Sequence, residues 1–199
     1  MQAIGLCRFS YPALGGFQVE HDDIAARIAY LYAPARLDER FRLFECFTLP
    51  SLLAQTDQDF TLAVVTGDSM PQPWLDRLRD LLAGLPQAVL PVLPPARHRP
   101  IMQAILNEHR REGPDPCLQF RLDDDDAVGL RFIERLREAA PETRKILRRF
   151  AHLAIDFNTG FIATPTPEGI LAAPTCQPLW TPGLAMALRP RVQLSIMNF

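Results

Sequence analysis

The chain contains almost no lysine. It has 199 residues with 21 arginine and lysine side chains, and Lys145 is its one lysine. A formal net charge of -2 gives no bulk attraction to nucleic acid or to an anionic membrane. We therefore expect neither as a partner. The positive charge is carried by arginine, whose planar guanidinium group suits phosphates and carboxylates.

Long apolar runs and paired cysteines are also lacking. No apolar stretch approaches the ~20 residues of a membrane span, and no charged segment followed by an apolar core marks a signal peptide at the N-terminus. The cysteines form no C-x-x-C pair and lie in or beside apolar sequence, which favours reduced, partly buried thiols. They are Cys7, Cys46, Cys117 and Cys176. These features are typical of a cytoplasmic protein.

The length and composition indicate one domain over residues 1–199. Hydrophobic residues make up 48% and charged residues 22%, an ordinary globular balance, without repeats or linkers. Strands alternate with helices over roughly the first 140 residues, which predicts an α/β sheet that is mostly parallel and flanked by helices. The expected strands are 3–9, 60–67, 87–93 and 116–122, of which 87–93 contains a proline and should lie at an edge.

Two expected helices meet prolines. Apolar residues recur at helical spacing over 37–55, and Pro50 should break or kink that helix because it lacks an amide hydrogen. Another helix should begin near Ala127 and end before Pro141. The tail then changes character: 152–164 is interpreted as a strand pair around an Asn-containing turn, and 169–173, 183–188 and 192–197 as short strands.

The stretch "LQFRLDDDDAVGL" places four aspartates directly behind an apolar strand. Asp126 could cap the helix after it, and the helix dipole favours acids there. This accounts for one or two aspartates but not for four. Alternate carboxylates on an extended chain lie ~6.5 Å apart, and each like-charge pair costs ~2.5 kcal/mol at an effective dielectric constant of 20.

A divalent cation would reverse the sign of that interaction. Strand geometry predicts Asp123 and Asp125 on one side, with Asp124 and Asp126 on the other. A pair on one side can bind Mg²⁺ or Mn²⁺, which keeps open positions for substrate phosphates. A calcium loop does not fit, because Ala127 and Val128 occupy ligand and glycine positions.

A phosphatase-type D-x-D-x-V pattern, Asp124, Asp126 and Val128, remains a weaker rival. It would make the chain a phosphotransferase. That pattern normally follows the first strand of its domain, and no second acidic motif is found downstream.

Several motifs resemble a known family. "LPSLLAQTDQDFTLAVVTGDS" (residues 49–69) is similar to the start of family 2-like glycosyltransferases, and "FRLDDDDAV" is similar to their strand ending in a D-x-D motif. Together with "IDFNTGFIATPTPEGI", these motifs make nearly the whole chain resemble a bacterial rhamnosyltransferase family.

The resemblance implies a GT-A fold that uses a nucleotide-diphosphate sugar donor, a carbohydrate or other hydroxyl acceptor, and Mn²⁺ or Mg²⁺. Residues 1–126 would bind the nucleotide and 127–199 the acceptor. By position, Asp125 would be the principal metal ligand, with Asp123 beside it. Asp123 and Asp124 would also lie near the ribose or sugar, and Asp68 would contact the nucleoside.

Two departures from the family pattern matter. The turn is "TGDS" rather than "DDGS", so recognition of the base by two acids is not carried over. The chain also ends on the apolar segment "VQLSIMNF", which we interpret as a strand with an exposed edge. We therefore expect either an incomplete catalytic unit or a homodimer that covers this strand.

Other candidates have two interpretations each. Arg8 ends the first strand where a nucleotide would lie, but could equally pair with an acid such as Asp68. Arg97 and Arg99 precede a helix and could meet a diphosphate, or lie in a solvated loop. Trp180 could form a platform for an acceptor sugar or simply pack.

A transferase that inverts configuration needs a carboxylate base. Asp156 and Glu168 are the candidates, because they flank the expected hairpin, and spacing does not choose between them. The alternative from another functional class is a non-catalytic domain that binds a nucleotide-sugar or a metal within a larger protein.

Overall fold

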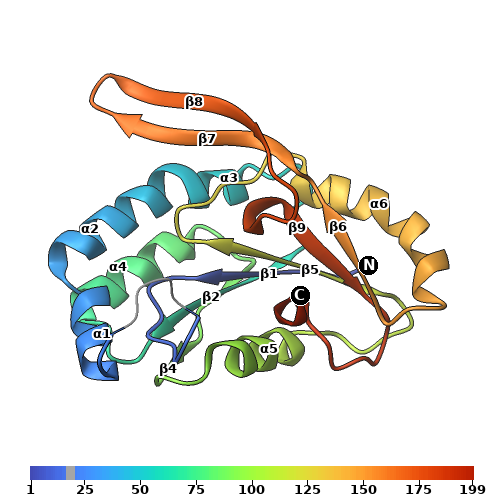
Figure 1. Cartoon of the computed structure of the whole chain (residues 1–199), viewed down its shortest axis with the longest axis horizontal. Helices are drawn as coiled ribbons and strands as arrows, with labels where there is room; N and C mark the ends of the chain where they lie inside the picture. The colour runs from blue at the N-terminus through green and yellow to red at the C-terminus, as the bar shows by residue number, and fades with distance from the viewer. Residues whose placement is uncertain (17–20) are drawn as a thin grey trace.

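A mixed sheet forms the centre of the protein (Figure 1). The structure, a computed structural model, describes residues 1–16 and 21–199. Within these residues the strand order is β3-β2-β1-β5-β9-β6, with β4 also beside β2. Strands β1 to β5 run parallel, whereas β9 is antiparallel to both of its neighbours. The strands are β1 (Ala3–Arg8), β2 (Thr61–Gly67), β3 (Ala88–Val89), β4 (Val92–Leu93), β5 (Cys117–Asp123), β6 (His152–Asp156) and β9 (Leu184–Leu188).

Helices cover both faces of this sheet. Alternation along the strands sends Leu118 and Phe120 into one core and Cys117 into the other. The first core contains residues of α1 (Ile24–Leu31), α2 (Pro34–Leu43), η1 (Phe44–Thr48), α3 (Leu49–Leu53), α4 (Gln72–Ala83) and α6 (Phe132–Leu147). The second contains residues of α5 (His98–Glu108) and η3 (Ile196–Asn198), on the opposite side (Figure 1). This confirms the predicted sheet, mostly parallel and flanked by helices.

Pro91 splits the predicted strand 87–93 into β3 and β4. Both pieces pair with β2, and β3 ends the strand order of the described sheet. The edge position expected from the proline is therefore confirmed.

Neither of the other two prolines interrupts its helix. The turn η1 is π-helical, and the amide of Leu49 donates to the carbonyl of Phe44, one residue further back than in an α-helix. This shift directly before Pro50 lets helix continue through α3, where the missing donor is tolerated near the first turn. Pro141 lies inside α6, because Ala140, Thr143 and Leu147 continue its buried face. The predicted helix end before Pro141 was wrong, whereas at Pro50 the helix continues with a π-helical distortion directly before the proline.

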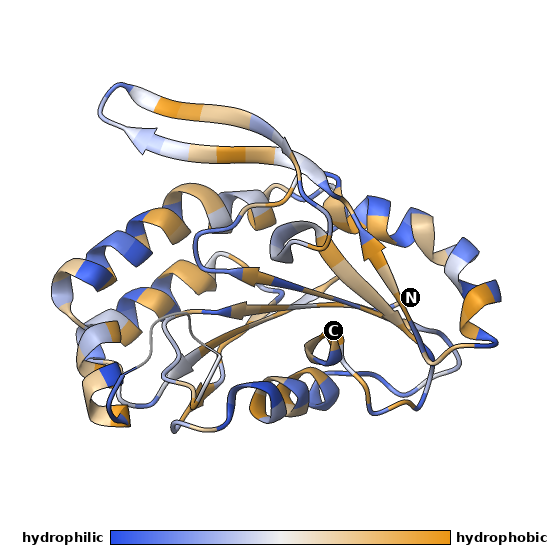
Figure 2. Ribbon diagram, viewed as in Figure 1, coloured by the Kyte–Doolittle hydropathy of each residue, from blue (hydrophilic) through white to orange (hydrophobic). Residues whose placement is uncertain are grey.

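The predicted hairpin over 152–164 was also wrong. Strand β6 pairs with β9 in the main sheet, whereas β7 (Thr159–Thr166) pairs with β8 (Gly169–Cys176) in a separate hairpin that projects from the body of the protein (Figure 1). Figure 2 shows hydrophobic colour on both hairpin strands. Glu168 is the one charged residue between 159 and 176, and both strands contain a proline, Pro165 and Pro174.

The last segment of the chain is not a strand. Residues 192–195 form a loop, and η3 follows with Ile196 and Met197 buried against α5. The amide of Ile196 donates to Gln119 Oε1 at 3.0 Å. The edge strand on which the expectation of a dimer or an incomplete unit rested is therefore not formed. None of the helices built from described residues is long and apolar enough to cross a membrane.

Candidate functional site

Polar side chains from neighbouring strands meet at one edge of the sheet. Strands β2, β1 and β5 are adjacent and parallel, and Arg8 pairs in register with Val65 and with Asp123. Asp68 follows β2 at this same carboxyl edge, where it is exposed and its amide donates to the carbonyl of Leu93 at 3.0 Å. The predicted location of Asp68 on the same edge as Asp123 is confirmed. This edge is where open α/β sheets bind ligands.

The aspartates form a tight turn rather than an extended run. The amide of Asp126 donates to the carbonyl of Asp123 at 3.2 Å, and Asp126 Oδ2 accepts from the amide of Asp123 at 2.9 Å. The predicted separation of alternate carboxylates onto two sides was wrong, because the strand ends at Asp123. Asp126 does not cap a helix either, since α6 begins at Phe132.

Arg40 binds two of the four carboxylates. From α2, its Nη1 atom lies 3.0 Å from Asp124 Oδ1 and 2.8 Å from Asp125 Oδ2. Asp124 is buried, whereas the side chain of Asp125 keeps 39% of its surface exposed. The guanidinium of Arg40 thus offsets part of the electrostatic repulsion among the four aspartates.

Burial sets the protonation of two members of the turn. It raises the pKa of Asp124 to about 6, although Arg40 acts in the opposite direction. It also raises the pKa of Asp126 to about 7, assisted by the charges of the three neighbouring aspartates. For Arg40, burial lowers the pKa, but Asp124 and Asp125 outweigh it and the pKa is raised. At neutral pH the turn is therefore only partly charged at Asp126.

The arginines suggested by the sequence lie on the α5 side of this edge. Arg8 Nη2 is 3.6 Å from Asp123 Oδ1, and its Nη1 donates to the carbonyl of Gly16 at 3.0 Å. Arg8 thus contacts the carboxylate of Asp123. Arg97 is exposed at the N-cap of α5 and borders a cavity of about 410 Å³.

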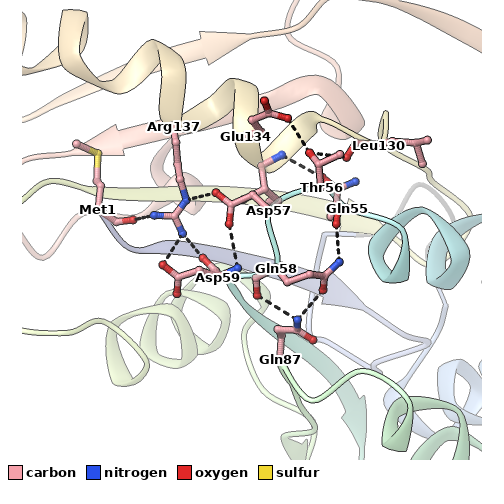
Figure 3. Close-up of polar contacts among 11 residues, drawn as sticks. Met1, Gln55, Thr56, Asp57, Gln58, Asp59, Gln87, Leu130, Glu134 and Arg137 are labelled. Atoms are coloured by element: carbon pink, nitrogen blue, oxygen red, sulfur yellow. Dashed lines mark hydrogen bonds and ion pairs between the residues drawn. The ribbon is translucent and has the colours of Figure 1, made fainter.

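The motif "SLLAQT" holds the segment behind the aspartate turn. Gln55 is almost fully buried; its Nε2 donates to the carbonyl of Gly129 at 2.9 Å, and its Oε1 accepts from the amide of Ile133 at 3.0 Å. The amide of Thr56 donates to Leu130 at 2.9 Å, and its hydroxyl donates to Glu134 at 2.7 Å (Figure 3). These bonds fix the path from the turn into α6.

A second group of contacts holds residues 57–59, between α3 and β2. Arg137 of α6 points at Asp57 and Asp59, with N–O distances of 2.7 and 3.0 Å, and also donates to the carbonyl of Met1 (Figure 3). Gln87 bridges to Gln58 (Figure 3). The polar residues of "QTDQD" are therefore structural braces that join the α3–β2 connection to α6.

The two candidate bases are far apart in the structure. Asp156 ends β6, which runs in the same direction as β5, so it lies at the carboxyl edge; its Oδ2 accepts from the amide of Leu179 at 2.9 Å. Asp156 thereby holds the loop that carries Trp180, whose ring is half exposed. Glu168 is exposed at the turn of the hairpin, separated from Asp156 by the full length of an eight-residue strand.

Within the part of the chain that the structure describes, no large set of candidate metal ligands comes together at this edge. Among the described residues, no group of three or more His, Cys, Asp or Glu side chains is placed to hold a metal ion. Asp123 and Asp125 keep exposed oxygen atoms, and Asp125 already accepts a cationic group from Arg40. Two carboxylates with water and phosphate oxygens suffice for Mg²⁺ or Mn²⁺. The larger cavity, about 1040 Å³, lies at the opposite edge, beyond Leu188 and the end of α5.

Three residues that shape this site were missed by the sequence analysis. Arg40 and Gln55 reach partners more than 70 residues away, and no local pattern marks such pairs. Arg121 did carry a signal, because it is a charged residue on a strand whose other positions are mostly buried.

Comparison with known proteins places the chain in a family. The crystal structure of S. aureus TarS 1-349 in complex with UDP-GlcNAc is similar to this chain, with 16% sequence identity and a TM-score of 0.39. The match covers 73% of this chain and 32% of TarS, so the chain spans about a third of that protein. Comparison with curated protein sequences found no match. The model of the family described as "Putative rhamnosyl transferase" matches residues 2–199, and the chain therefore belongs to that family.

Proposed function

We propose that this protein transfers a sugar from a nucleotide-diphosphate donor to a hydroxyl group of an acceptor, with rhamnose as the sugar that the family description suggests. The observation that carries the proposal is the convergence at one sheet edge. Asp68, Arg8 and the aspartate turn follow three adjacent parallel strands there. Carboxylates for a ribose or a metal thus lie beside a guanidinium that can meet phosphate.

The reaction breaks the bond between the anomeric carbon and the diphosphate, and forms a bond from that carbon to the acceptor oxygen. The acceptor hydroxyl gives its proton to a base, and the nucleoside diphosphate leaves with the electron pair. Negative charge develops on phosphate oxygens, so fixed positive groups near them lower the barrier. A divalent metal on Asp125 and Asp123 would supply such charge.

Asp156 is the better placed of the two candidate bases. It lies at the same edge as the aspartate turn, whereas Glu168 stands at the tip of the hairpin. Among the described residues, Asp156 Oδ1 is buried without a hydrogen-bond partner, so no other group of the protein occupies this oxygen. Trp180, the residue after Leu179, whose amide donates to Asp156, offers a half-exposed ring on which an acceptor sugar could stack.

The test is a screen of nucleotide-diphosphate sugars with Mn²⁺, first for thermal stabilisation and then for release of nucleoside diphosphate with a panel of glycan acceptors. Asp156→Asn should abolish transfer while donor binding persists, because it removes the base. An exposed acid on α4, Asp80, provides the matched Asp80→Asn control. Binding of a donor without transfer to any acceptor would instead favour the non-catalytic alternative.

A further inference from the structure

Within the described part of the chain, Arg121 feels the charge of Asp123 but makes no direct contact with an acceptor. It lies on β5 two residues after Gln119, and alternation directs both side chains to the α5 side of the sheet. Gln119 is explained, because its Oε1 accepts from the amide of Ile196. Arg121 forms no hydrogen bond or ion pair within residues 1–16 and 21–199, and its Nε atom is buried without a partner. Burying a guanidinium without a hydrogen-bond acceptor costs desolvation free energy, so such a group indicates a place where an acceptor can bind.

Further positive groups surround the same place. Arg8 lies on the neighbouring strand, and Arg99 stands exposed in the first turn of α5. Burial, and then the charges of Arg8, Arg121 and Arg99, lower the pKa of His98 to about 4, so its ring is neutral at pH 7. The ring packs against Gly16, where a Cβ atom would clash with it. Three arginines and a histidine therefore gather at the entrance of α5.

The acids of the aspartate turn mostly have partners of their own among the described residues. Asp123 lies 3.6 Å from Arg8, and Asp126 Oδ2 accepts from the amide of Asp123 at 2.9 Å. Asp124 and Asp125 are paired with Arg40 of α2. Within the described residues the sheet edge is thus divided, with the Arg40-bound carboxylates toward α2 and the arginine cluster toward α5.

A cavity adjoins the positive side. It measures about 410 Å³ and is lined by Leu14, Gly16 and residues 97–100. This volume is within the range of small-molecule sites. The positive end of the α5 dipole adds to the charge at this entrance, although the His98 amide already donates to the carbonyl of Leu14 and Pro100 has no amide hydrogen.

We propose that Arg121, Arg99 and Arg8, with His98 between them, form an anion site on the α5 side of the sheet edge that binds the diphosphate of the donor. The identity of the anion rests on the proposed function; the site itself rests on the arginine cluster and the cavity. Guanidinium groups bind phosphate oxygens in pairs, so a diphosphate would satisfy Arg121 and join the first turn of α5 to β5.

The experiment is calorimetric titration with inorganic pyrophosphate in EDTA, which removes any contribution from a metal. We expect Arg121→Gln and Arg99→Gln each to weaken pyrophosphate binding about tenfold or more, because each removes a charged hydrogen bond. Arg79→Gln, which changes an exposed arginine of α4, should bind like the unmodified protein. Arg99 is exposed, so its variant decides the question even where Arg121→Gln does not fold.

Two outcomes would overturn the site: no pyrophosphate binding by the unmodified protein at millimolar concentration, or equal affinity in the Arg99→Gln variant. Parallel titrations with orthophosphate and with nucleoside diphosphates distinguish a general phosphate site from a donor site; tighter binding of orthophosphate than of any diphosphate would contradict the assignment. Pyrophosphate binding without sugar transfer would refute the proposed function and leave the anion site standing. Sugar transfer at an unchanged rate in the Arg121→Gln and Arg99→Gln variants would refute the anion site and leave the proposed function standing.

Discussion

Arg40 on α2 contacts Asp124 and Asp125, 84 and 85 residues further along the chain, through a single Nη1 atom. The pair with Asp124 is mostly buried, since the two side chains retain 23% and 8% of their exposure. Removing one partner of such a pair leaves the other desolvated and uncompensated. Arg40 is therefore a structural requirement of the aspartate turn.

The first prediction concerns Arg40→Ala. It should lower the free energy of unfolding at pH 7 by about 2–3 kcal/mol, below the range for fully buried pairs because Arg40 is partly exposed. Since Arg40 lowers the pKa of Asp124, the variant should raise that pKa above about 6. The loss should shrink at pH 5, where Asp124 is protonated in both proteins. Urea unfolding at both pH values measures this, with Arg79→Ala as an exposed control; equal losses at pH 5 and pH 7 would contradict it.

Gln55→Ala should be destabilising by about 1–3 kcal/mol, because it leaves the buried Ile133 amide without its acceptor and removes the partly buried bond to the Gly129 carbonyl. Hydrogen exchange at the Ile133 amide should also become faster in this variant, because the amide has lost its acceptor. Gln72→Ala, which loses one exposed bond to Asp76, is the control and should change stability by less than about 0.5 kcal/mol. Unchanged exchange at Ile133 would show that Gln55 does not fix the start of α6.

The third prediction is a dependence of stability on pH that belongs to His98. Its folded pKa of about 4 lies below its ordinary value of 6.5, so the unfolded chain takes up a proton first as the pH falls. Stability from this group is complete above pH 6.5 and declines toward pH 4, by about 1 kcal/mol after allowance for partial exposure, or about 3 °C in Tm.

Asp124 and Asp126 act in the opposite direction, because protonation relieves the cost of burying their charge. The measurement is therefore the difference in Tm between the unmodified protein and His98→Gln from pH 4 to pH 7. A difference that stays constant over this range would contradict the prediction.

Asp125→Asn tests the metal site. It should remove the Mn²⁺-dependent part of nucleoside-diphosphate binding, because a neutral amide is a weak ligand for a hard cation. Stability should change by less than about 1 kcal/mol, since the lost pair with Arg40 is partly exposed. Titrations with Mn²⁺ and with EDTA measure the difference, and Asp80→Asn should match the unmodified protein. Equal affinity in Mn²⁺ and EDTA would reject a metal at this turn.

Patterns local in sequence predicted the sheet well. Apolar strands that alternate with helices placed Arg8, Asp68 and Asp123 at one edge, because parallel strands share their carboxyl ends. Local patterns do not name partners, so β6 and β7 were joined in a hairpin although they pair with β9 and β8. For the same reason, local patterns did not predict the long-range contacts of Arg40 and Gln55.

Proline was weighted too strongly inside helices. Pro141 costs one backbone bond, yet Ala140 and Leu147 keep α6 packed on the sheet, and tertiary burial prevails over propensity. Strand alternation was likewise extended too far, since β5 ends at Asp123 and the turn redirects the following carboxylates.

The prolines of the projecting hairpin affect whether strands of two molecules can pair at high protein concentration. Pro174 pairs with Phe161 and Pro165 pairs with Ile170, and these two pairs are four residues apart on β7. Both are therefore pairs of the same kind. Because proline has no amide hydrogen to donate between the strands, both ring nitrogens face the outer sides of the hairpin. Each outer border thus lacks one amide donor within its strand. A neighbouring molecule finds no complete row of hydrogen-bonding groups to extend, which opposes fibril-like stacking through this hairpin on both sides.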